Sequence, residues 1–204
     1  MSSAESSTPE PATGPVPGRV RWRRFAILFV PAFAAAAVMI GLTAQGVLAA
    51  SISVSGSAFE VTASKLVAND GFEQFGGVVA ETGGAQHPIA VTALKSAQIS
   101  DLCQSVSVGG IVLKLTAGGG STPVSASNMI IDADQLSGSA AFQNIVIGQD
   151  AGTLSASGVP GPSGGFGEQA DTATFTNIRQ HTWLTTAGTF TLPGFNLSLG
   201  SSTC

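Results

Sequence analysis

The chain has 204 residues, of which 10% are charged and 44% are hydrophobic. This length excludes a large multidomain enzyme, and this composition excludes a disordered chain, because disorder needs low hydrophobicity and high charge. From residue 51 onward, ten acidic residues stand against four basic ones, a net charge of −6. Binding of nucleic acid needs clustered lysines and arginines that neutralise phosphates, so we exclude nucleic acid as a partner.

The N-terminal part of the chain has the charge pattern of an export signal. Residues 1–18 are mainly Ser, Thr, Pro, Ala and Gly and predict a disordered cytoplasmic tail. Residues 19–50 begin with a basic flank that contains Arg21, Arg23 and Arg24. A basic flank before an apolar stretch is typical of secretory signals.

One hydrophobic helix is expected after this flank, because residues 25–42 carry no charge. It is either a signal peptide cleaved near Ala49 or Ala50, or a signal anchor that stays in the cytoplasmic membrane. In both cases the positive-inside rule keeps the arginines in the cytoplasm. We therefore expect residues 51–204 to be exported, as a secreted domain or as the extracellular part of a membrane-anchored protein.

The exported region has the pattern of an all-β domain. Short runs rich in Val, Ile, Thr and Phe alternate between polar and apolar residues and are separated by Gly, Asn, Asp and Pro. No window sustains the apolar stripe of a helix. The expected strands are 52–54, 58–63, 78–80, 89–93, 110–116, 127–132, 142–147, 172–178 and 189–199. A Gly- and Pro-rich surface loop is expected at 158–167.

A spaced pattern of apolar residues occurs twice in this region. Its two copies are Val61, Ala63, Leu66 and Phe72, and then Ile131, Ala133, Leu136 and Phe142. Repeats of a supersecondary unit are typical of stacked β architectures. The pattern favours an irregular β-solenoid or a β-sandwich, and it predicts that Ala63 and Ala133 are buried at equivalent places.

The two cysteines of the chain, Cys103 and Cys204, both lie in the exported region. An even number of cysteines in an oxidising compartment predicts a disulfide. This bond would close a loop of about 100 residues and hold a C-terminus that would otherwise fray.

One serine lies in a string with the form of a hydrolase nucleophile motif. Ser163 is the centre of Gly-x-Ser-x-Gly, and Asp171 and His181 follow in the chain order of an α/β-hydrolase triad. That motif needs a strand before the serine and a helix after it, whereas the flanks here are Gly and Pro. We therefore assign no catalytic residue, and these three remain the candidates of an alternative hydrolase interpretation.

Three carboxylates, Asp132, Asp134 and Asp150, are candidates for Ca²⁺ ligation. In a strand, positions 132 and 134 lie on one face and Ala133 on the other, so a solvated strand face explains the first two equally well. Neither His87 nor His181 has a Cys or Glu at ligand spacing. We assign no metal and no cofactor.

The chain resembles a family of uncharacterised actinobacterial, Streptomyces-type exported proteins whose members are sometimes labelled cholesterol esterase. The matching segments, beside the basic and apolar start, are 59–66, 101–106, 113–120, 145–150 and 187–190. The resemblance covers almost the whole chain. It implies export and a single domain, and it implies no established activity.

Together these observations predict a non-catalytic, secreted or envelope-bound protein with a structural or surface-interaction role. Its expected partners are the cytoplasmic membrane, through the N-terminal segment, and the cell wall, lipid or further copies of the chain. Two alternatives stay open. One is a small secreted lipid-ester hydrolase that uses Ser163, Asp171 and His181, and the other is a lipid- or ligand-binding module that uses inward Phe and Leu side chains.

Overall fold

The computed structural model describes residues 52–54 and 57–204. The expected tail, basic flank and hydrophobic helix at 1–50 lie outside the described residues, so export and cleavage remain predictions. Across the described ranges, no helix is long and apolar enough to cross a membrane. The regular structure there is β-strand apart from one single-turn 3-10 helix at Ala151–Thr153, which confirms the all-β class.

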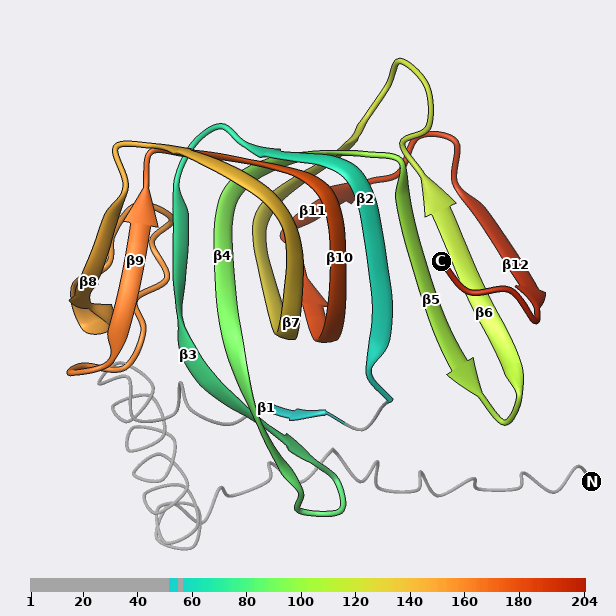
Figure 1. Ribbon diagram of the computed structural model, residues 1–204, viewed down its shortest axis with the longest axis horizontal. Helices are drawn as coiled ribbons and strands as arrows, with labels where there is room; N and C mark the ends of the chain where they lie inside the picture. The colour runs from blue at the N-terminus through green and yellow to red at the C-terminus, as the bar shows by residue number, and fades with distance from the viewer. Residues whose placement is uncertain (1–51, 55–56) are drawn as a thin grey trace, which may run out of the picture. The chain divides into compact units, whose positions relative to one another are not determined.

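The described residues form twelve strands that belong to one sheet. The strands are β1 (Ile52–Val54), β2 (Phe59–Ala68), β3 (Phe72–Glu81), β4 (Gln86–Ser100), β5 (Leu102–Val108), β6 (Ile111–Ala117), β7 (Val124–Gln143), β8 (Val146–Asp150), β9 (Phe166–Ala170), β10 (Thr172–Thr186), β11 (Thr189–Thr191) and β12 (Asn196–Gly200). Their order is β12-β6-β5-β2-β10-β7-β4-β3-β9-β8, with β1 beside β3 and β11 beside β7. Strands β5, β6 and β12 therefore lie at one end of the sheet and β8 and β9 at the other (Figure 1).

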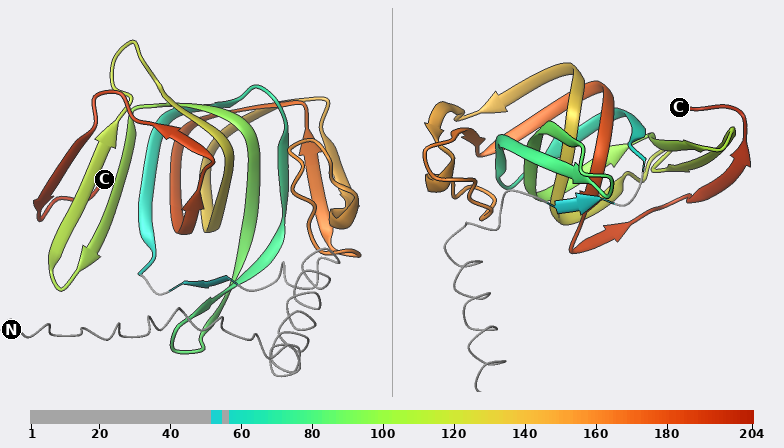
Figure 2. Two further views of the ribbon diagram at one scale, coloured as in Figure 1. Left: turned by 180° about the vertical axis from the view of Figure 1, so that it is seen from behind. Right: turned by 90° about the horizontal axis from the view of Figure 1, so that it is seen from below.

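The centre of the sheet consists of long, curved antiparallel strands (Figures 1 and 2). Asp101, the one residue between β4 and β5, has a left-handed φ of 51°. Both strands nevertheless pair with the same edge of β2 in one register, with Ser100 opposite Lys65 and Cys103 opposite Thr62. The end of β4 thus leads directly into β5, and this connection places the β5-β6-β12 end beside β2.

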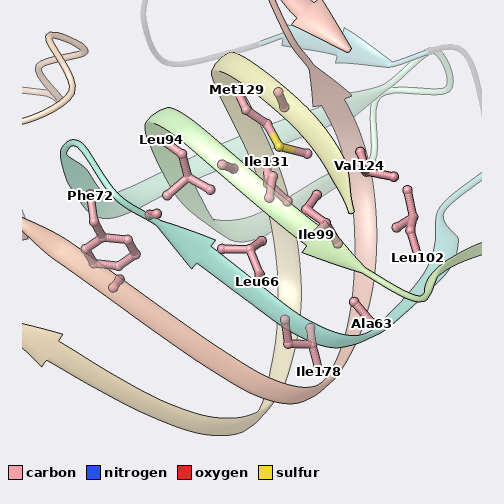
Figure 3. Close-up of a cluster of buried hydrophobic side chains, with 14 of the residues drawn as sticks. Ala63, Leu66, Phe72, Leu94, Ile99, Leu102, Val124, Met129, Ile131 and Ile178 are labelled. Carbon is pink, nitrogen blue, oxygen red and sulfur yellow. The ribbon is translucent and has the colours of Figure 1, made fainter. Parts of the chain in front are cut away.

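The core lies on the face that β2, β4, β7 and β10 share (Figure 3). Phe72, Phe142 and Phe175 meet there, with ring centroids 5.3 to 5.8 Å apart. Leu66, Leu94, Ile99, Val124, Met129, Ile131 and Ile178 are buried around them. Each fully buried side chain of this size contributes about 1.5–3 kcal/mol of hydrophobic stabilisation, so this cluster is a main source of the burial energy that offsets chain entropy.

The two copies of the repeated pattern share burial but not structure. Ala63 and Ala133 are both buried, as predicted. The first copy spans β2, a turn and β3, whereas the second lies entirely within β7. Leu66 is 6% exposed and its counterpart Leu136 is 41% exposed. The pattern is therefore not a repeated supersecondary unit. Among the described residues, β1–β3 is the only parallel pair and all strands belong to one sheet, which differs from the parallel coils of a solenoid and from the two sheets of a sandwich.

The Gly- and Pro-rich segment between β8 and β9 is largely exposed, as expected of a surface connection, but its beginning is held against the sheet. Glu73 of β3 is fully buried and accepts hydrogen bonds from the backbone N–H groups of Ser157 and Val159, at 2.7 and 3.1 Å, and from the Ser157 hydroxyl. Gly71 has a φ of +83°, and a Cβ there would lie 2.1 Å from the carbonyl oxygen of Ala156. Only glycine permits this approach.

Candidate functional site

The β5-β6-β12 end of the sheet has one apolar face. Cross-strand pairs place Leu199 beside Leu113 and Leu113 beside Val106. The next pair on the same face is Leu197 beside Leu115. Leu197 and Leu199 are 52% and 73% exposed. Because alternate residues of a strand share a face, these side chains form a continuous apolar surface that the described residues do not cover.

A groove of about 400 Å³ lies on this surface and reaches β2. Its lining is Ser57, Phe59, Gln104, Ser105, Val106, Val108, Leu113, Leu115 and Leu197. None of these side chains carries a charge. Ligand sites of this size, lined by apolar side chains with a few polar groups, are typical of small-molecule binding. An uncharged, mostly apolar lining of this kind is complementary to an aliphatic or aromatic group.

The opposite face of the same strands is closed by the C-terminal tail. Cys103 of β5 and Cys204 form a disulfide with their Cα atoms 5.8 Å apart, so the predicted cysteine pair is at bonding distance. The backbone N–H of Cys204 donates to Ser105 Oγ at 3.1 Å, and Lys114 Nζ donates to the carbonyl of Thr203 at 3.2 Å. The tail therefore covers the polar face and leaves the apolar face open.

A second, polar groove of about 700 Å³ is lined by β2, β7, β10 and the C-terminal tail. In it, His181 Nδ1 lies 2.7 Å from Asp134 Oδ1, and Trp183 Nε1 donates to Asp134 Oδ2 at 3.0 Å. Burial alone would raise the pKa of Asp134, but the hydrogen bonds from Trp183 and His181 and the positive charge of protonated His181 outweigh it. The pKa of Asp134 is consequently lowered below its ordinary value.

Trp183 also contacts the other histidine of the chain. The His87 ring stacks on Trp183 with centroids 4.2 Å apart, and His87 Nε2 lies 2.8 Å from Glu81 Oε1. His181 meets Trp183 edge to face at 6.0 Å. Each histidine thus has its own carboxylate and shares one indole ring, so the two histidines pack against the same residue although they are far apart in sequence.

The three hydrolase candidates have separate environments. The Asp171 carboxylate accepts a hydrogen bond from Asn144 Nδ2 at 2.7 Å, and His181 is bonded to Asp134. Ser163 lies close to Gly152, where an added Cβ would approach its hydroxyl to 2.6 Å. Within residues 57–204, no hydrogen bond joins Ser163, Asp171 and His181 to one another. The hydrolase interpretation remains a prediction.

The three calcium candidates also differ from one another. Asp132 is 2% exposed, so its expected place on a solvated strand face is wrong; its Oδ1 has no hydrogen-bond partner among the described residues, and burial raises its pKa to about 6. Asp150 Oδ1 accepts from the backbone N–H groups of Gly152 and Gly164 at 2.8 and 2.9 Å. In the part of the chain that the structure describes, no three His, Cys, Asp or Glu side chains are grouped to hold a metal ion.

The apolar groove was only partly foreseeable from sequence. Alternation predicts a strand at 110–116, and ligand binding by inward Phe and Leu side chains is one of the predicted alternatives. Phe59 and Leu197, however, join the groove from strands that are far from β6 in the chain. The local sequence pattern does not predict that Phe59 and Leu197 line one groove. It predicts which residues share a face of a strand, but not whether another part of the chain covers that face.

The fold and the two grooves define an all-β, disulfide-bonded domain with one uncharged apolar surface left open. The model of a family described as a family of unknown function (DUF6230) matches residues 55–204, and the chain belongs to this family. No curated protein and no solved structure matches the chain. This match is consistent with the predicted resemblance to a family of uncharacterised proteins. The actinobacterial origin and the esterase label remain predictions.

Proposed function

We propose that this protein is a non-catalytic, exported protein of the cell envelope that binds the acyl chain of a lipid in the apolar groove. One observation carries the proposal: the groove is open to solvent, has a volume of about 400 Å³ and has no charged side chain in its lining. Exposed apolar patches rimmed by polar residues mark ligand, membrane or protein sites. Export is supported by the basic and apolar N-terminal sequence and by the cysteine pair.

The size of the apolar face favours an acyl chain over a protein docked onto that face. Two strands of seven residues and one of five, at about 3.3 Å per residue and about 4.8 Å per strand, give a projected area of about 300 Å². A stable protein interface buries about 800 Å² on each partner. An aliphatic chain needs no such area, because each methylene that leaves water contributes about 0.8 kcal/mol.

A binding titration tests the proposal. The full-length protein, purified in detergent and exchanged into lipid-free buffer with the minimum detergent needed, is titrated with a dansyl-labelled long-chain fatty acid. In the Leu197→Asp variant a carboxylate replaces a lining side chain, and we expect the affinity to fall at least about tenfold. The matched control is Leu199→Asp, which makes the same change two residues along β12 but outside the lining.

The pair of variants decides between specific and nonspecific binding. We expect Leu199→Asp to bind the probe within about twofold of the unchanged protein, a difference well under 1.4 kcal/mol. Equal loss in both variants would mean that the probe adheres to the apolar face in general, and the absence of saturable binding to the unchanged protein would overturn the proposal. Mass spectrometry of lipids that copurify with the native protein identifies the acyl chain.

A further inference from the structure

Strand β12 is an edge of the sheet. Its five residues pair with β6 in an unbroken register from Asn196 opposite Thr116 to Gly200 opposite Val112. On its other side it pairs with no strand of the described part. All five residues are exposed, and the strand lies at the outer end of the sheet (Figures 1 and 2). Its outward N–H and C=O groups are therefore available to another strand.

Edge strands are normally protected against pairing by charges, prolines, bulges or covering segments. The opposite edge, β8, has such protection: its register with β9 is interrupted between Ile147 and Gln149, Gly148 has a φ of +86°, and Asp150 ends the strand. By contrast, residues 195–203 contain no charged side chain. β1 and β11 also pair on one side only, but each has three residues and so offers few outward backbone groups. β12 is thus a longer edge without such protection, and its unbroken register leaves it suited to accept a partner strand.

The sequence of β12 is complementary to itself. In an antiparallel pair centred on Ser198, Leu197 of each copy lies opposite Leu199 of the other. Both leucines lie on the apolar face, so the pairing forms two cross-strand leucine contacts, the kind of contact that stabilises sheets. The pairing also makes the apolar faces of two copies continuous. A two-fold axis through Ser198 relates the copies, as in an isologous dimer.

Charge also favours a second copy at this edge. Residues 51–204 have ten acidic and four basic side chains, so two copies repel each other over most of their surfaces. The uncharged segment 195–203 is a place where two acidic domains can approach without opposing carboxylates. We propose that two copies of the chain pair through β12, antiparallel and centred on Ser198, to form one continuous sheet.

Cysteine cross-linking of the full-length protein tests this pairing. Residues directly opposite in an antiparallel pair have Cβ atoms about 4.5–5.5 Å apart, so Ser198→Cys should form an intermolecular disulfide under mild oxidation. The matched control is Ser107→Cys, an exposed serine on β5 that lies opposite Val112 of β6 and away from the β12 edge. We expect a reducible dimer band on a denaturing gel for Ser198→Cys and not for Ser107→Cys.

A charge variant gives an independent readout by sedimentation equilibrium in detergent. Ser198→Glu faces Lys114 within its own chain, which favours the β12–β6 pair, but it brings two carboxylates together at the two-fold axis. Opposed like charges at an interface cost several kcal/mol, so we expect the dimer dissociation constant to rise at least about tenfold and Ser107→Glu to leave it unchanged. Failure of Ser198→Cys to cross-link, equal cross-linking at position 107, or an unchanged dimer in Ser198→Glu would overturn the pairing. Ser198 is not in the groove lining. The outcome of the fatty-acid titration is therefore independent of the outcome of these tests of β12 pairing.

Discussion

Asp132 offers a sharp test of the electrostatics of this fold. Its side chain is 2% exposed, its Oδ1 has no hydrogen-bond partner among the described residues, and burial raises its pKa from 3.8 to about 6. The raised pKa means that the folded state binds the proton more tightly than the unfolded state. The resulting stabilisation is fully present below pH 3.8 and is lost as the pH rises through 6.

The magnitude follows from the size of the pKa difference. Each pKa unit corresponds to about 1.4 kcal/mol, so above pH 6 the buried carboxylate destabilises the fold by about 3 kcal/mol relative to its protonated form. Asp132→Asn keeps the shape of the side chain and removes the ionisation. We expect the variant to be more stable than the unchanged protein at pH 7–8, by up to about 3 kcal/mol, with this advantage shrinking toward pH 4.

Urea unfolding followed by Trp183 fluorescence measures this difference over a series of pH values. The control is Asp134→Asn, two residues along β7. The contribution of Asp134 to stability should depend on pH in the opposite direction. The pKa of Asp134 is lowered in the fold, so its stabilisation is present above its unfolded pKa and is lost as the pH falls through the folded pKa. A difference between Asp132→Asn and the unchanged protein that stays constant with pH would refute the reasoning.

Three other perturbations have defined outcomes. Replacing Cys103 and Cys204 by serine opens a loop of sequence separation 101 and should lower the free energy of unfolding by about 4.7 kcal/mol in the chain-entropy description, measured by urea unfolding under matched non-reducing conditions. Glu73→Gln puts an amide N–H₂ among donors in the 157–159 segment, and should cost about 2–3 kcal/mol and speed proteolysis there. Gly71→Ala forces a Cβ against the Ala156 carbonyl and should lower the melting temperature, whereas Gly76→Ala, where a Cβ meets nothing within 4 Å, should not.

The strands were predictable where polar and apolar residues alternate strictly. Residues 52–54 were placed correctly, and 172–178 lies within β10. The lengths were not predictable, because β7 runs for 20 residues through polar positions such as Gln135 and Ser137. These positions remain in the strand because β10 supplies hydrogen-bond partners for their backbone, a long-range effect that no local window contains.

The missed strands have different causes. β5 follows β4 after the single residue Asp101 and so lacks a turn signal in front of it. β9 begins at Phe166, inside the Gly- and Pro-rich segment, and is extended because β3 and β8 pair with it on both sides. The polar groove also depends on long-range pairing that the local sequence does not predict. Asp134, His181 and Trp183 meet because two register shifts between β7 and β10 occur there.

The disulfide and the apolar groove depend on each other through the register of β12. A strand that slips by one residue turns all of its side chains to the opposite face, so a slip of β12 would move Leu197 and Leu199 from the groove side to the side of the tail. Only three residues separate Gly200, the last residue of β12, from Cys204. The bond to Cys103 therefore limits how far β12 can slide along β6. It favours the register that holds the leucines on the open face, where both the proposed acyl-chain binding and the proposed β12 pairing need them.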